Sequence, residues 1–111
     1  AIRADPNNNN NYYLSKGNAL DSLGRKEEAV ECFIEAIRIY PNNSAAANGI
    51  GNIFYDEKRY EEAVKHYNDA IRINPNSALY CYNKGLALRK LGRREEAVEC
   101  YKEAIRIDQN Y

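Results

Sequence analysis

The 111-residue chain contains no methionine and no tryptophan, only three prolines, and no excess of charge of either sign. Lysine and arginine together number 16, and so do aspartate and glutamate. Because proteins that bind nucleic-acid phosphates normally carry a basic surplus, we expect no nucleic-acid partner. No apolar run approaches the roughly 18 residues of a membrane span, so we expect no membrane insertion.

Cysteine is also scarce, with three residues at wide spacing: Cys32, Cys81 and Cys100. An odd number of scattered cysteines is typical of free thiols in a reducing compartment, which predicts a cytoplasmic location. No basic segment followed by an apolar stretch resembles a secretory signal. Because methionine is absent even at residue 1, we expect the chain to be a piece of a longer protein.

The dominant feature of the sequence is a strict period of 34 residues. The tetrapeptide Ala-Ile-Arg-Ile recurs three times in register, and so does a single glycine in the first part of each repeat. Such a period indicates one supersecondary unit stacked on copies of itself in a single solenoid domain. We predict a preceding tail and Asn-rich linker over 1–9, then repeats over 10–43, 44–77 and 78–111.

Each repeat carries two helical patterns and no pattern of a strand. In the second pattern of the first repeat, Ala29, Phe33, Ala36 and Ile37 follow the spacing of three and four that marks one face of a helix. Nothing alternates with a period of two. The sequence therefore predicts an all-α fold, with first helices over 10–23, 44–57 and 78–91 and second helices over 26–39, 60–73 and 94–107.

Turn and cap residues mark the ends of these helices. Gly24 and Gly92 follow the first helices, where a left-handed residue is least costly for glycine. Repeat two has Lys58 instead, at a cost of about 1 kcal/mol, so we expect this turn to be less stable or differently shaped. Asn42, Asn43 and Asn76 offer side-chain oxygens as N-caps for the next helix.

A pair of glutamates opens every second helix: Glu27-Glu28, Glu61-Glu62 and Glu95-Glu96. Each pair opposes the positive end of the helix dipole. We therefore interpret these carboxylates as helix stabilisers and not as acid–base catalysts.

These spacings resemble the tetratricopeptide repeat family, whose 34-residue unit is a helix-turn-helix with small residues and an aromatic at fixed places. The resemblance covers residues 10–111 and implies an all-α, right-handed superhelical solenoid. We expect Gly51 to face Ala63, so that the two helices of a repeat approach closely while Tyr67 fills the space between them. The other two repeats carry the equivalent residues Gly17, Ala29 and Phe33, and Gly85, Ala97 and Tyr101.

The chain departs from the family pattern at two places in the first helix of each repeat. Where the family usually has a large aromatic residue, the three repeats have Tyr13, Ala47 and Cys81. Where the family usually has leucine, they have Lys16, Ile50 and Lys84. The lysine stems can pack while their ammonium groups reach water.

The resemblance implies a protein–protein interaction scaffold whose first helices line a concave groove. Asparagine can donate and accept hydrogen bonds at once, tyrosine adds apolar contact, and Arg89 with Lys90 could attract an acidic residue or a C-terminal carboxylate. We therefore expect a protein or an extended peptide as the partner. The candidate partner-binding residues are Asn18, Asn48, Asn52, Tyr55, Tyr82, Asn83, Arg89 and Lys90.

One subtype of the family can be compared directly, the chaperone-binding domains that clamp two carboxylates with lysine, arginine and asparagine. Aligned from repeat one, this chain has Leu14, Asn18, Gly49, Leu79 and Asn83 at the clamp positions. Aligned from repeat two, Asn52 and Asn83 match but Asn48 replaces a lysine. Because the cations are missing, clamp binding of a chaperone tail is not expected.

Two other roles stay open. The last helix presents Val98, Tyr101 and Ile105, so the module could stack end to end on copies of itself. The chain could also be a non-catalytic appendage of a larger enzyme.

We expect no catalytic residue, no cofactor and no metal. Cys32, His66 and Cys100 are equivalent in the three repeats, but neighbouring helices lie about 8–10 Å apart, whereas zinc ligands bind at about 2.0–2.3 Å. We interpret these three residues as half-exposed surface positions and Cys81 as a small buried hydrophobe.

Overall fold

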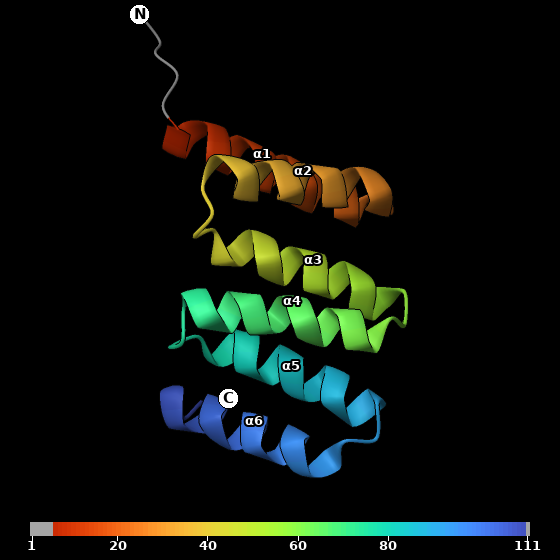
Figure 1. The fold of residues 1–111 in the computed structure, drawn as a ribbon, viewed down its shortest axis with the longest axis vertical. Coiled ribbons are helices and arrows are strands. Elements are labelled where there is room, and N and C mark those ends of the chain that lie inside the picture. Colours follow the sequence, from red (N-terminus) through yellow and green to blue (C-terminus); the bar gives the residue numbers. More distant parts are fainter. Residues whose placement is uncertain (1–5, 111) are drawn as a thin grey trace, which may run out of the picture.

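The structure, a computed structural model, describes residues 6–110 as six α-helices joined by short turns, with no strand in that range (Figure 1). The predicted all-α repeat solenoid is confirmed. The second helices begin and end at the predicted residues, and α3 and α5 end one residue earlier than predicted. The helices are α1 (Pro6–Ser22), α2 (Lys26–Ile39), α3 (Ser44–Asp56), α4 (Tyr60–Ile73), α5 (Ala78–Lys90) and α6 (Arg94–Ile107).

The helices pair within repeats and the pairs stack along the long axis of the molecule (Figure 1). The pairs α1–α2, α3–α4 and α5–α6 have the most extensive contacts, followed by α4–α5 and α2–α3. As a result α1 and α6 lie at opposite ends of the stack (Figure 1).

The predicted Asn-rich linker is wrong, because α1 begins at Pro6 and residues 6–10 are helical. Proline is favoured at the first position of a helix, where no intrahelical N–H bond is lost. Asparagine costs only up to about 0.7 kcal/mol per residue relative to alanine, so a helix packed further along its length extends through the tract. The predicted tail of a preceding repeat, residues 1–5, lies outside the described residues.

The closest approach within each repeat joins a glycine to an aromatic ring. A Cβ added to Gly51 would lie 2.6 Å from the Tyr67 ring, and one added to Gly85 would lie 2.5 Å from the Tyr101 ring. The atoms nearest to Gly51 therefore belong to Tyr67 and not to Ala63, which corrects the predicted pairing. The absence of a side chain at Gly51 therefore makes room for the Tyr67 ring and not for the methyl group of Ala63.

The ring of Phe33 extends the same contact between repeats. It lies against Gly17 of α1 and Gly49 of α3, and a Cβ on either glycine would come within 2.7 Å of it. Phe33 is fully buried. One ring thus packs the second helix of repeat one against the first helices of two successive repeats.

The three internal turns have one shape. Lys58 has φ +64°, beside +80° for Gly24 and +82° for Gly92. The turn hydrogen bonds also correspond: Arg59 N–H donates to Phe54 C=O at 2.8 Å, and Arg25 N–H to Leu20 C=O at 2.9 Å. The left-handed Lys58 is confirmed, and the alternative of a differently shaped turn is wrong, because tertiary packing imposes the same geometry. That the turn at Lys58 is less stable than the other two turns stays a prediction.

Side chains cap α3 and α5. Asn43 Oδ1 accepts from the Ala46 N–H at 3.1 Å, as predicted. The cap of α5 is Ser77, whose Oγ accepts from the Tyr80 N–H at 3.2 Å, so the assignment to Asn76 is wrong by one residue. Serine and asparagine cap equally well, and the position of the first helical turn decides between them.

Glutamates in the first turn of each second helix pair with the arginine that precedes the helix. The Arg25 guanidinium donates to Glu28 at 2.5 and 2.7 Å, and the Arg59–Glu62 and Arg93–Glu96 pairs repeat the arrangement. The hydrogen bond from Arg25 lowers the pKa of the Glu28 carboxyl. These pairs are exposed, so solvent screens them and each contributes little to stability. The contacts agree with a stabilising role for these carboxylates.

We predict that Gly51→Ala destabilises the protein. In a helix this change ordinarily stabilises by about 1 kcal/mol, but here the new methyl group would meet the Tyr67 ring at 2.6 Å. Overpacking of this kind costs about 1–3 kcal/mol. Urea denaturation would show a lower midpoint, whereas a higher midpoint would contradict the packing described here.

Candidate functional site

The first helices of the repeats lie on the inner, concave face. The pairs α1–α3 and α3–α5 come within 8 Å between Cα atoms. Among residues 6–110, no such approach joins α2 to α4 or α4 to α6. Because the first helices lie closer together than the second helices, the stack bends toward α1, α3 and α5. The predicted binding residues all come from these three helices.

The amide side chains on this face partly serve the fold. Asn83 Nδ2 donates to Asn48 Oδ1 at 2.9 Å, which links α5 to α3. Asn48 is buried, so it supports the face and offers a ligand little surface. Asn52 Oδ1 accepts from the Tyr67 hydroxyl at 2.6 Å. Only Asn18, on α1, is an exposed amide of the predicted set.

The two predicted tyrosines differ in exposure. Tyr55 is half-buried and packs edge-on against Tyr60, with ring centroids 5.3 Å apart. Burial raises the pKa of the Tyr55 phenol, which keeps its hydroxyl protonated as a donor. Tyr82 is exposed and lies 5.8 Å from the ring of Tyr101. Tyr82 is therefore the ring of the predicted set that a partner can reach more freely.

Charged residues at the two ends of the face differ in whether they form ion pairs. Lys26 Nζ donates to Asp21 at 2.5 Å and to Asp56 at 3.0 Å, so both carboxylates share one cation. The hydrogen bond to Asp21 is the main cause of the raised pKa of the Lys26 ammonium. Arg89 and Lys90 are exposed and form no ion pair within the described part of the chain. The basic end of the face is the one left available to a partner.

The cysteines and the histidine occupy separate environments. Cys32 is buried, which corrects its expected half-exposed position: it packs in the core with Phe33 and Ala36. Cys100 and His66 are half-buried, and the His66 ring stacks on Phe54 with centroids 5.3 Å apart. Cys81 is buried, as predicted. No group of three or more His, Cys, Asp or Glu that could hold a metal occurs within residues 6–110.

Comparison with protein families identifies the fold. The sequence matches a family model described as tetratricopeptide repeat over residues 11–43 and 78–111, and one described as TPR repeat over residues 51–92. The chain belongs to the tetratricopeptide repeat family. Members of this family are protein-interaction modules and generally non-catalytic scaffolds.

Solved structures of similar shape include two TPR domains and MamA. The first TPR of Spaghetti (RPAP3), bound to the HSP90 peptide SRMEEVD, is 22% identical, with 100% of this chain and 87% of that chain covered at a TM-score of 0.90. The second TPR of Spaghetti (RPAP3), bound to the same peptide, is 22% identical, with 90% and 87% covered at a TM-score of 0.85. MamA is 24% identical at a TM-score of 0.86, with 91% of this chain covered; the chain spans 59% of that structure. No curated protein sequence matches.

No helix in the described range is both long and apolar enough to cross a bilayer.

We predict that stability falls as the pH drops below about 6.5. Burial lowers the pKa of His66 below its ordinary 6.5, so the unfolded chain binds a proton more readily than the folded one. The stability that depends on neutral His66 is therefore fully present above the pKa of histidine in the unfolded chain. It is lost as the pH falls below that value toward the lower pKa of the folded chain. His66 is the one histidine of the sequence. Urea midpoints at about pH 7.5 and 5.5 should differ in the parent and coincide in His66→Gln; equal midpoints in the parent would contradict the prediction.

Proposed function

We propose that the concave face binds an extended segment of a partner protein, with an acidic residue of that segment directed toward α5. The observation that carries the proposal is the contrast in charge between the two ends of the face. Lys26 pairs with Asp21 and Asp56 at one end, whereas Arg89 and Lys90 are exposed and have no ion pair among the described residues. A partner carboxylate at this end would gain charge-assisted hydrogen bonds.

The remaining contacts suit a peptide better than a compact ligand. An extended backbone offers donors and acceptors in a row, and the exposed Asn18 amide can serve both. The exposed Tyr82 ring supplies an apolar surface with a polar tip. Because Asn48 and Asn83 bond to each other, their part is to fix the spacing of α3 and α5 beneath the ligand. The proposed role is that of a non-catalytic scaffold.

The proposed ligand differs from the one in the two Spaghetti structures. Those domains are bound to an HSP90 peptide. This chain has Leu14 and Leu79 at places where chaperone-binding members have cations, so we propose recognition of a single acidic group at Arg89 and Lys90. Three free thiols support the further proposal of a reducing, cytoplasmic setting.

The proposed site is tested with peptides selected from a displayed random library and titrated by fluorescence anisotropy. We expect Arg89→Ala with Lys90→Ala to weaken a selected acidic peptide about tenfold and to flatten its salt dependence, because two exposed charge contacts are lost. A matched control is Lys65→Ala with Arg94→Ala, which removes two exposed cations from α4 and α6. Equal loss in both variants, or no loss in the first, would contradict the proposed site.

Asn52→Ala with Asn83→Ala is a poorer probe of binding than the sequence suggests. It removes the acceptor of the Tyr67 hydroxyl and the donor to buried Asn48. Each unpaired group costs about 1–3 kcal/mol, so stability and binding would change together.

End-to-end stacking is a second candidate, favoured by the exposure of α6. Val98 is 47% exposed, whereas its equivalent on α4, Val64, is 7% exposed because α5 covers it. Tyr12 of α1 and Leu23, in the turn that follows α1, are exposed. We propose that α1 of a second copy could cover α6 as α5 covers α4, in a heterologous contact that does not close.

This second candidate predicts a mass that rises above 12.7 kDa with concentration in multi-angle light scattering. We expect Val98→Glu with Ile105→Glu to return the mass to that of a monomer, because the charges would remain buried and unpaired in the contact. A constant mass across the concentration range would exclude stacking and leave peptide binding as the function to test.

A further inference from the structure

A hollow of about 220 Å³ lies between α2 and α4, on the face opposite the concave one. Ile34 and Ile37 of α2 form one wall, and Ala47 and Ile50 of α3 lie at its base. The opposite wall, from α4, consists of His66, Asp69, Arg72 and Ile73. The hollow therefore has an apolar side, an apolar base and a mixed side that carries one carboxylate and one guanidinium.

Small and apolar replacements at this junction create the hollow. Ala47 occupies a place where the family usually has a large aromatic residue, and no Cα atom of α2 lies within 8 Å of one of α4. Ile50 stands where the other repeats have Lys16 and Lys84. Ile34 is 54% exposed, and its equivalents are Asn68 and Lys102. The apolar character is therefore specific to the junction of repeats one and two.

Arg72 is the charged residue that differs most from its equivalents. The corresponding Arg38 and Arg106 donate hydrogen bonds to Glu35 and Glu103, one turn earlier in the same helix. In repeat two that carboxylate belongs to Asp69, whose side chain is one methylene shorter. Within residues 6–110, Arg72 forms no ion pair with Asp69 or any other carboxylate. Its guanidinium is free at the edge of the hollow.

We propose that this hollow is a second docking site, which takes a partner-protein segment carrying a large apolar side chain next to an acidic residue. The apolar side chain occupies the hollow against Ile34 and Ile50, and the carboxylate pairs with Arg72. A backbone N–H of the segment donates to the half-buried Asp69 carboxylate. A helix is about 10–12 Å across with its side chains, so a single side chain enters and no helix does.

The peptide is favoured over a simple organic acid because the wall carries both a guanidinium, Arg72, and a carboxylate, Asp69, which also interacts electrostatically with His66. A carboxylate alone would meet Arg72 but repel Asp69. A peptide brings the carboxylate together with an N–H donor and the apolar group that the base requires. This site is independent of the proposed concave-face function, since Ala47 and Ile50 of α3 are its only contribution from a first helix and none of the candidate concave-face residues lines it.

The test uses the ¹⁵N-labelled chain and the peptide acetyl-Gly-Ser-Phe-Glu-Ser-Gly-amide. We expect millimolar peptide to shift the backbone amide resonances of Ile34, Ile50 and Arg72. Glutamine in place of the peptide's glutamate should weaken binding about fivefold, as expected for one exposed ion pair. Alanine in place of its phenylalanine should abolish the shifts, because the apolar contact is lost.

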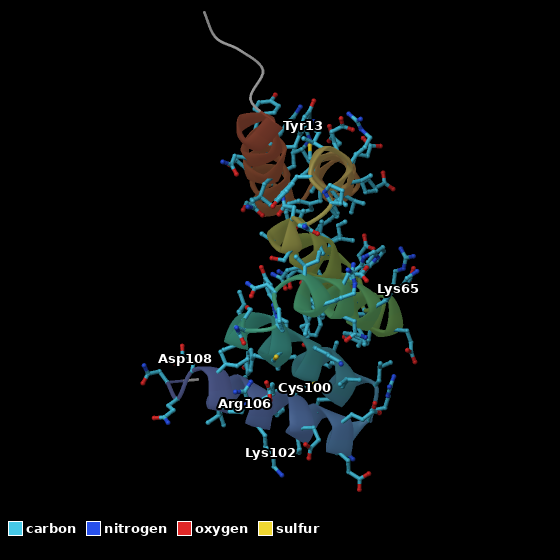
Figure 2. The ribbon with its side chains drawn as sticks, turned by 60° about the vertical axis from the view of Figure 1, so that its left-hand side comes forward. Tyr13, Lys65, Cys100, Lys102, Arg106 and Asp108 are labelled. Carbon is cyan, nitrogen blue, oxygen red and sulfur yellow. The ribbon has the colours of Figure 1, made fainter. Side chains whose placement is uncertain are left out.

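Variants at exposed or half-buried positions of α4 locate the effect. Asp69→Glu restores the carboxylate that pairs with arginine in the other repeats, so it should weaken the glutamate peptide about fivefold. Arg72→Gln should make the glutamate and glutamine peptides bind equally, which a merely structural role would not do. The matched control is Glu103→Asp on α6, which frees Arg106 away from the hollow and should leave binding unchanged. Figure 2 shows this separation: the labelled Arg106 lies on α6, whereas the labelled Lys65 marks α4, the helix that lines the hollow.

Four results would overturn the proposal. Absence of shifts at α2 and α4 at millimolar peptide would show that the hollow does not bind. Equal affinity for the two peptides in the parent chain would show that Arg72 plays no part. Shifts confined to α1, α3 and α5 would assign the peptide to the concave face. Shifts at the hollow that grow with protein concentration alone would make a second copy the occupant.

Discussion

The fold depends on an aromatic ring packed directly against glycine at each place where two helices of a repeat meet. Gly17 with Phe33, Gly51 with Tyr67 and Gly85 with Tyr101 leave no room for a Cβ, so the ring itself sets the distance between the helices. Phe33 also contacts Gly49 and so joins repeat one to repeat two. A stack held by neighbours alone needs this contact in every repeat, because within residues 6–110 no helix of repeat one comes within 8 Å, between Cα atoms, of a helix of repeat three.

The concave face has a structural role besides the binding role proposed for it. Hydrogen bonds between Asn83 and Asn48, and between Tyr67 and Asn52, lie on this face and hold α3 against its neighbours. Groups that are already paired and buried position a surface more than they recognise a partner. In the proposed function, recognition therefore depends on the exposed residues, Asn18, Tyr82, Arg89 and Lys90.

Repeat two departs most from the other repeats, and its departures have separate consequences. Lys58 adopts the left-handed conformation of the equivalent glycines, so packing overrides the preference of the residue. Ala47 leaves a hollow instead of filling it, and the shorter Asp69 leaves Arg72 without the ion pair of its equivalents. Substitutions that keep the backbone of a repeat can therefore still give one junction its own surface chemistry.

The sequence by itself determined the repeat, the helix pairs and most helix ends, because these follow from local spacing, propensity and capping. It also placed the candidate residues on α1, α3 and α5. It could not show that Asn48 is buried, that Lys26 joins Asp21 to Asp56, or that Cys32 lies in the core. Only the tertiary structure decided these three features. They depend on distances between side chains of different helices, and a repeat period in the sequence gives no such distances.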